Sequence, residues 1–336
     1  IEETEQDSQE STGEVSEHAD LLNLGDIEFA YCTEFFIINL NKKTTKADID
    51  KLRETYLTMG DCVLVIGDID FVKVHVHSNQ PGKLLEAALN LGEIDKIKIE
   101  NMLEQNRQLM AQREAEKKEQ GMLSVCAGKG LKNIFKDLLV DAVLEGGQTM
   151  NPSANDIAEA ASRINCDHVF VFPNNKNIIL AAQQANALIE GKQLHVIPTK
   201  NIPQGLAAAL AFNPDATVEE NVANMSSVLD TVNAGQVTYA VRSTEIDGFK
   251  LKKGDIIGLD NKNILTKGSD INEVTKQLID KIVTPSHTMI TLYFGEDVTE
   301  ENACKLKEQL QEKYSDCEVD CYYGGQPIYY YIVSLE

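Results

Sequence analysis

The sequence predicts a protein of mixed α/β and α+β class, in which a ferredoxin-like β-α-β-β-α-β domain precedes a two-lobed domain with a doubly wound parallel sheet. Residues 26–102 give strand and helix patterns in the β-α-β-β-α-β order, and residues 122–212 repeat a strand-then-helix rhythm. Residues 213–336 mix helices and strands without that rhythm. A chain of 336 residues is long enough for two or three domains, each with its own core.

The first segment, residues 1–25, reads as an acidic tail or linker. Residues 1–20 hold eight acidic side chains and no Lys or Arg, a composition that cannot bury a core. Because the chain begins at Ile1 rather than Met, we expect a fragment or a processed product.

The middle segment, 26–102, is defined by alternating strands and by Pro and Gly at helix ends. Two of its strands are joined by a short turn and predict a hairpin. In order, we expect a strand at 27–40, a helix at 46–60, strands at 62–67 and 71–77, a helix from Pro81 to Gly92, and a strand at 94–102.

Residues 103–121 are polar and helix-prone without a wide apolar stripe, so they predict a helical linker with a domain boundary near Gly121. After it, four short apolar strands alternate with helices over 122–212, which indicates a parallel sheet. The second lobe, 213–336, is expected to pack beside the first.

A metal site is one interpretation of the strand "FVKVHVH" (71–77). His75 and His77 lie two residues apart and therefore on one face, and the usual strand order of the split unit places Cys32 on the neighbouring strand. Opposed residues have Cβ atoms about 4.5–5.5 Å apart, within reach of a common zinc. The alternative is a solvated strand face with an unrelated cysteine. A zinc hydrolase would lack a convincing general base beyond Glu34.

Composition excludes several classes of partner and setting. The net charge of -22 argues against nucleic acid and against electrostatic docking on anionic lipid. The sequence contains no apolar run near the roughly 20 residues that span a bilayer, so we expect no integral membrane protein. Seven dispersed cysteines, an odd number, favour a reducing cytoplasm over a disulfide framework.

Several long motifs resemble the bacterial fatty acid kinases, which are multidomain proteins of the dihydroxyacetone-kinase-like type. "YCTEF" followed by "GDIDFVKVHVHSNQPGKLLEAALNLGEIDKIKIENMLEQ" resembles their middle domain, and "EGGQTMNPS", "PNNKNIILAAQQA", "VIPTKNIPQGLAAALAF" and "GGQPIYYYIVSLE" resemble their C-terminal domain. The resemblance covers roughly residues 26–336. It implies that Cys32, His75 and His77 bind a metal.

The same resemblance implies that catalysis belongs elsewhere. In that family an N-terminal kinase domain holds ATP through magnesium ions on clustered aspartates, and we recognise no such cluster in this sequence. "CAGKGLKN" (126–133) also lacks the spacing of a P-loop. We therefore expect ATP and magnesium to act only through that kinase domain, and this chain to be inactive alone.

The C-terminal segment resembles DegV-type proteins, the fatty-acid carriers that work with these kinases. In carriers a Ser/Thr loop and a histidine near the C-terminus hold the acyl carboxylate. Here the loop corresponds to Thr149, Asn151 and Ser153, whereas the C-terminal "YYGGQP" contains Gln326 and no histidine. Ser153 is equally suited to begin a helix.

Two polar segments follow strand ends, the ligand-facing edge of a doubly wound sheet. Turn formation is the alternative explanation for their Asn and Pro residues. The expected recognition residues there are Asn174, Asn175, Lys176, Thr199, Lys200 and Gln204.

The leading hypothesis is the non-catalytic middle and C-terminal part of an ATP-dependent fatty acid kinase that makes acyl phosphate from carrier-bound fatty acid. The middle domain would supply a zinc site and a homodimer contact, because Phe71 lies on the open sheet face, and the C-terminal domain would bind the DegV-type carrier. The alternative is a stand-alone fatty-acid- or lipid-binding protein.

Overall fold

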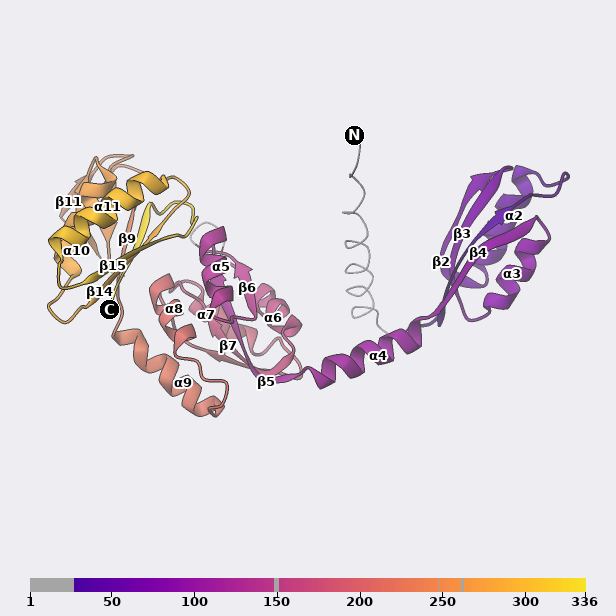
Figure 1. Ribbon diagram of the computed structural model, residues 1–336, viewed down its shortest axis with the longest axis horizontal. Helices are drawn as coiled ribbons and strands as arrows, with labels where there is room; N and C mark the ends of the chain where they lie inside the picture. The colour runs from indigo at the N-terminus through magenta and orange to yellow at the C-terminus, as the bar shows by residue number, and fades with distance from the viewer. Residues whose placement is uncertain (1–26, 148–150, 247, 261–262) are drawn as a thin grey trace, which may run out of the picture. The chain divides into compact units, whose positions relative to one another are not determined.

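The computed structural model describes residues 27–147, 151–246, 248–260 and 263–336, and it forms two compact units, one ending at Glu116 and the other spanning Lys117–Glu336. Figure 1 shows the elements of each unit. Antiparallel and parallel sheets are both present, so the predicted mixed fold class is confirmed. The acidic segment 1–25 lies outside the described residues.

The first unit has the predicted β-α-β-β-α-β order. Its four strands lie in the order β2-β3-β1-β4 and every neighbouring pair is antiparallel, which confirms that the third strand lies between the first and the second. The first strand begins at Tyr31, later than the expected residue 27. The elements are β1 Tyr31–Ile38, α2 Lys46–Leu57, β2 Gly60–Asp68, β3 Phe71–Ser78, α3 Pro81–Leu89 and β4 Glu93–Asn101.

The helices α2 and α3 cover one face of this sheet (Figure 1). The alternating valines Val72, Val74 and Val76 point into that interface and are fully buried. Tyr56 on α2 is also fully buried, and its hydroxyl donates to the carbonyl of Leu84 at 2.7 Å. Because side chains alternate across a strand, burial of the valines leaves His75 and His77 on the opposite, open face.

A polar helix follows, α4 (Met102–Ala115), in which Met102 is the buried residue. The next strand, β5, begins at Lys118. The expected linker 103–121 is therefore a helix to Ala115, and Gly121 lies inside a strand rather than at its start.

In the second unit the first layer is a parallel sheet in the order β6-β5-β7-β8. Helices α5 and α8 contribute to the core on one face, and α6 and α7 to the core on the other, so the sheet is doubly wound as predicted. The elements are β5 Lys118–Cys126, α5 Lys129–Asp137, β6 Ala142–Glu145, α6 Ala154–Arg163, β7 Cys166–Phe172, α7 Ile179–Ala185, β8 Gln193–Val196 and α8 Ile202–Leu210.

The remaining chain forms a six-stranded mixed sheet in the order β13-β12-β9-β16-β14-β15, with α10 and α11 packed on it, and a separate pair β10-β11. The elements are α9 Val218–Ser227, a 3-10 turn Val228–Asp230, β9 Asn233–Tyr239, β10 Thr244–Ile246, β11 Phe249–Leu251, β12 Ile256–Leu259, β13 Ile264–Gly268, α10 Ile271–Ile282, β14 Met289–Phe294, α11 Glu300–Lys313, β15 Glu318–Tyr323 and β16 Tyr331–Leu335.

Helix α9 packs with the parallel-sheet lobe, although its position after residue 212 assigned it to the second lobe. Met225 and Leu229 share a core cluster with Phe170 and Leu206, and Asn221 donates to the buried Gln120 of β5 at 3.0 Å. The chain therefore enters the second sheet at β9. Among the helices of the described residues, none has both the length and the apolar character needed to cross a bilayer.

Candidate metal centre

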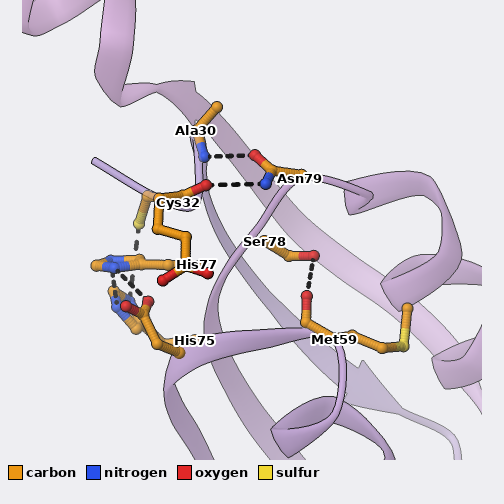
Figure 2. Close-up of polar contacts among 9 residues, drawn as sticks. Ala30, Cys32, Met59, His75, His77, Ser78 and Asn79 are labelled. Atoms are coloured by element: carbon orange, nitrogen blue, oxygen red, sulfur yellow. Dashed lines mark hydrogen bonds and ion pairs between the residues drawn. The ribbon is translucent and has the colours of Figure 1, made fainter. Parts of the chain in front are cut away.

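The open face of the first unit brings the predicted ligands together. In the β1–β3 ladder Cys32 is directly opposite His77, and Glu34 is directly opposite His75. Figure 2 shows the side chains of Cys32, His75 and His77 converging on one region in front of the sheet. One ligand atom from each of the three lies within 4.8 Å of the others, so the structure contains the Cys/His group that the sequence predicts.

The spacing of the two imidazoles suits a shared ion. Nε2 of His75 lies 3.2 Å from Nε2 of His77. A tetrahedral zinc with Zn–N bonds of about 2.0–2.1 Å would separate two nitrogen ligands by about 3.3–3.4 Å, close to this value. The sulfur of Cys32 lies 3.9 Å from Nδ1 of His75, the ring nitrogen that contacts Glu34. The thiol therefore borders the same ring from the side away from Nε2 of His77. Two imidazoles and a thiolate are a ligand set that zinc prefers, with a fourth position left open.

Carboxylates on the neighbouring strands orient both rings. Oε1 of Glu34 lies 2.7 Å from Nδ1 of His75, and Oδ1 of Asp61 lies 3.4 Å from Nδ1 of His77. A carboxylate that accepts from Nδ1–H leaves Nε2 with its lone pair, as in carboxylate–histidine–metal arrangements. The His75 hydrogen bond lowers the pKa of Glu34. Burial and the neighbouring His75 lower the pKa of His77, which favours the neutral, ligating form.

Polar contacts at one end of the site fix the strands that carry it (Figure 2). Oδ1 of Asn79 accepts from the amide of Ala30 at 2.8 Å, and Ser78 donates to the carbonyl of Met59 at 2.7 Å. These bonds join the start of β1 and the chain before β2 to the end of β3. They hold the half-buried Cys32 and His77 in register.

Two residues beside this group were not predicted from the sequence. Asp61, Cys62 and His77 form a second set of ligand atoms within 4.8 Å of one another, and Asp61 and Cys62 are exposed. They lie where β2 departs from regular pairing between Asp61 and Leu64. The hairpin pattern places this stretch near His77, but the irregularity that selects Asp61 and Cys62 has no clear sequence signal.

Apolar side chains lie on the same open face. Ile66 and Phe71 are 55% and 52% exposed, and Leu64 beside His75 is also exposed. The ring centroid of Phe36 on β1 lies 6.4 Å from that of Phe71. We call Phe36, Leu64, Ile66 and Phe71 the open-face patch.

In the second unit, most of the expected strand-end residues are interior rather than exposed. Asn174, Asn175, Thr199, Gln204 and Gln326 are all at least nine-tenths buried. The amide of Asn174 donates to Thr199 at 2.9 Å, and its side chain donates to Ser124 and to the carbonyl of Val125. Gln204 accepts from the Lys200 amide and donates to the Leu229 carbonyl. These contacts make the strand-end loops rigid.

The exposed part of the predicted edge is smaller. Lys176 and Lys200 are exposed, as are Asn151 and Ser153. Ser153 caps α6, because its hydroxyl accepts from the Asp156 amide while the Asp156 carboxylate accepts from the Ser153 amide. Thr149 lies outside the described residues.

A cavity of about 60 Å³ lies at the carboxyl ends of β5 and β7, where the strand order of the parallel sheet reverses. Its lining joins Cys126, Asn174 and Asn175 of the parallel-sheet lobe to Gln326 and Tyr329 before β16. The two lobes of the second unit therefore meet at the ligand-facing edge. This cavity is small compared with the roughly 300–1,000 Å³ of ordinary ligand pockets. A second cavity of about 430 Å³, within that range, adjoins it and shares Cys126, Ala127 and Pro327 in its lining.

Two curated relatives match the chain over almost its full length. Protein YloV of Bacillus subtilis is 41% identical over 324 residues, which cover 94% of this chain and 58% of YloV. An uncharacterized protein of Staphylococcus aureus strain USA300 is 36% identical over 322 residues, with the same 94% and 58% coverage. The chain thus spans less than two thirds of the length of these relatives.

Solved structures show more distant likeness. A DegV family protein of Corynebacterium glutamicum has 13% identity and a TM-score of 0.47, covering 65% of this chain and 96% of that chain. DegV of Bacillus subtilis, described as a fatty acid binding protein, has 14% identity and a TM-score of 0.46, covering 65% and 99%. The dihydroxyacetone kinase of C. freundii has 9% identity and a TM-score of 0.46, covering 66% and 49%.

Two family models match nearly all of the described chain. Residues 28–109 match the FakA-like middle domain of fatty acid kinases, and residues 121–336 match the FakA-like C-terminal domain. These ranges correspond to the unit with the Cys/His group and to the two-lobed unit. The chain belongs to the FakA-like family of fatty acid kinase proteins.

Proposed function

We propose that this chain is the non-catalytic middle and C-terminal part of a fatty acid kinase, which makes acyl phosphate from fatty acid held by a carrier protein. The match of both units to the two family domains carries this proposal. The phosphoryl transfer itself would need an ATP- and magnesium-binding kinase domain, to which this chain would be joined or bound. Its own contribution would be structural and organisational.

The middle domain would bind one zinc ion through Cys32, His75 and His77. The facing Nε2 atoms, the nearby thiol and the carboxylates on Nδ1 all support this assignment. Bound zinc would join β1 to β3 and neutralise part of the local negative charge.

The open-face patch would form a homodimer contact. Phe71 and Ile66 are more than half exposed on a sheet face that α2 and α3 do not cover. Apolar side chains clustered in this way favour a covering partner, and a two-fold contact lets the patch cover itself.

The two-lobed domain would bind a DegV-type fatty-acid carrier through its strand-end edge. Lys176 and Lys200 project from loops whose buried neighbours are fixed by hydrogen bonds, so the edge is preorganised. A carrier docked there would be held close to the kinase domain, which raises the effective concentration of its acyl group. The setting would be cytoplasmic.

The alternative, a stand-alone lipid-binding protein, has less support. A cavity of about 60 Å³ between the lobes is lined partly by Asn174, Asn175 and Gln326. The larger cavity beside it, of about 430 Å³, has the charged residues Lys129, Lys132, Glu145 and Glu296 in its lining. An acyl chain would need a longer apolar tunnel than this, and its carboxylate would be costly to bury without a cationic or hydrogen-bonding partner.

Reconstitution tests the proposed function. The purified chain would be added to the separate ATP-binding kinase domain, the fatty-acid-loaded carrier, ATP and magnesium, and acyl phosphate would be measured. We expect product only when all three proteins are present. Equal acyl phosphate formation with and without this chain would contradict the proposal.

A further inference from the structure

We propose that Asp61, Cys62 and Nδ1 of His77 form an outer metal-binding position, through which a thiophilic divalent ion enters and leaves the inner group Cys32–His75–His77. This proposal presupposes the inner zinc site described above and adds its route of exchange. One ligand atom from each of Asp61, Cys62 and His77 lies within 4.8 Å of the other two, and Nδ1 of His77 is 3.4 Å from Oδ1 of Asp61.

His77 belongs to both positions because its two ring nitrogens face different neighbours. Nε2 lies 3.2 Å from Nε2 of His75, whereas Nδ1 lies 3.4 Å from Oδ1 of Asp61. A neutral imidazole offers one lone pair at a time. A single ion can therefore occupy either position, and His77 can pass it from one to the other.

The backbone of β2 creates the outer position. Asp68 is paired with Phe71, and the ladder runs regularly from there to Leu64, which is paired with His75. Continued in the same register, it would place Cys62 opposite His77, but Asp61 is opposite His77 instead. Cys62 is the extra residue, with φ of 48° in the left-handed region. A bulge of this kind usually has glycine at that position, because L side chains rarely adopt its conformation. The bulge thus places a carboxylate and a thiol side by side next to His77.

Exposure gives the direction of exchange. Asp61 and Cys62 are exposed, whereas Cys32, His75 and His77 are half-buried. An ion arriving from solvent meets the outer pair first. Thiolate, imidazole and carboxylate together suit Zn²⁺ and Co²⁺ and leave a position for water.

The transfer balances in protons as well as in ligands. With the ion on Nδ1, the ring proton of His77 lies on Nε2 and is donated to Nε2 of His75. When the ion moves to Nε2, this nitrogen loses its proton and Nδ1 takes up a proton. The new Nδ1–H group then donates a hydrogen bond to the Asp61 carboxylate. Cys62 regains a proton and Cys32 loses one. Asp61 therefore changes from a ligand to the carboxylate that orients His77.

Cobalt binding to the full chain tests the outer position directly. After metal removal, Co²⁺ is added and the thiolate-to-cobalt absorption is recorded. In Cys32→Ser we expect a weaker but definite absorption band from one thiolate. This band should disappear in Cys32→Ser/Cys62→Gly. It should persist in the control Cys32→Ser/Cys304→Ser, because Cys304 is exposed on the other unit. Glycine suits the backbone at residue 62, so folding should be preserved. Absence of the band in Cys32→Ser would overturn the proposal.

Exchange kinetics provide the second measurement. Cys62→Gly should retain the zinc stoichiometry of the unchanged protein but release zinc to a chromophoric chelator more slowly, because the outer thiolate through which the ion leaves has been removed. Release at the unchanged rate would also overturn the proposal. If the unchanged protein binds no zinc, the inner site fails instead, so the two failures are distinguishable.

Discussion

Single residues decide whether the open face of the first unit is a metal site or a solvated strand. Cys32, His75 and His77 converge, and Glu34 contacts Nδ1 of His75 at 2.7 Å. Zinc should therefore be found at close to one per chain, and the His75→Ala/His77→Ala double variant should lose it. Elemental analysis of purified protein measures both. Full zinc content in the double variant would exclude these ligands.

Glu34 should matter through the ring that it orients. In Glu34→Gln the amide can place its NH₂ group against Nδ1 and favour the wrong tautomer, so we expect zinc affinity to fall about 10–100-fold. Competition with a chelator measures the change. The control is Asp95→Asn, which lies opposite Phe36 at the other end of the sheet and should bind zinc normally. Unchanged affinity in Glu34→Gln would show that the carboxylate does not support the site.

Buried thiols give a test that depends on pH. Burial raises the pKa of Cys126 to about 12 and that of Cys166 to about 11. At pH 8 both should resist alkylation in the folded chain, while the exposed Cys304 reacts. Because these thiols ionise more easily when unfolded, the free energy of unfolding should fall as the pH rises above about 8.5. Mass spectrometry after alkylation measures the protection of these thiols, with urea-unfolded protein as the control. Rapid labelling of Cys126 at pH 8 would contradict the predicted protection.

The candidate group Cys32, His75 and His77 could be predicted from the sequence, whereas its exposed neighbours could not. Alternation in 71–77 fixes which face His75 occupies, and the strand order of the split unit then places Cys32 beside it. Asp61 and Cys62 depend on a bulge with a left-handed residue, which hydrophobic patterning does not reveal. The polar loop around Asn174 predicted an exposed recognition residue, whereas Asn174 is buried. The sequence pattern does not show that the chain before β16 covers these strand ends.

At the scale of elements, α2 is joined to α3 by one buried hydrogen bond. Tyr56→Phe removes the hydrogen bond to the Leu84 carbonyl and leaves that carbonyl with only its partner inside α3. We expect local stability to fall by about 1–2 kcal/mol. Backbone amides of α2 should then exchange roughly five- to thirtyfold faster, measured by hydrogen exchange and mass spectrometry. The control Leu57→Ala changes an exposed side chain on the same helix, and equal exchange in both variants would contradict this role.

The open sheet face predicts the oligomeric state. Phe71→Glu places a charge in the open-face patch, so sedimentation should show monomer where the unchanged chain is a dimer. Leu57→Glu is a matched control, because Leu57 is 61% exposed on a helix that covers the opposite face. A monomeric unchanged chain at tens of micromolar, roughly the range for an interface of ordinary size, would contradict the dimer.

For the whole molecule, the proposed role of this chain is recognition rather than phosphoryl transfer. Its net charge is -22, and yet two exposed lysines, Lys176 and Lys200, project at the strand-end edge without an ion-pair partner among the described residues. The fold class and the order of elements followed from sequence patterns. The meeting of the two lobes over β5 and β7 did not, because it depends on contacts between distant segments.

Calorimetric titration of the full chain tests the central claim most directly. A fatty-acid-loaded DegV-type carrier should bind, and free oleate should give no saturable heat. Lys176→Glu should weaken carrier binding by reversing a charge at the edge, while Lys136→Glu, a control at the end of α5, should leave it unchanged. Tight oleate binding with no measurable carrier affinity would contradict the proposed role and identify a lipid-binding protein instead.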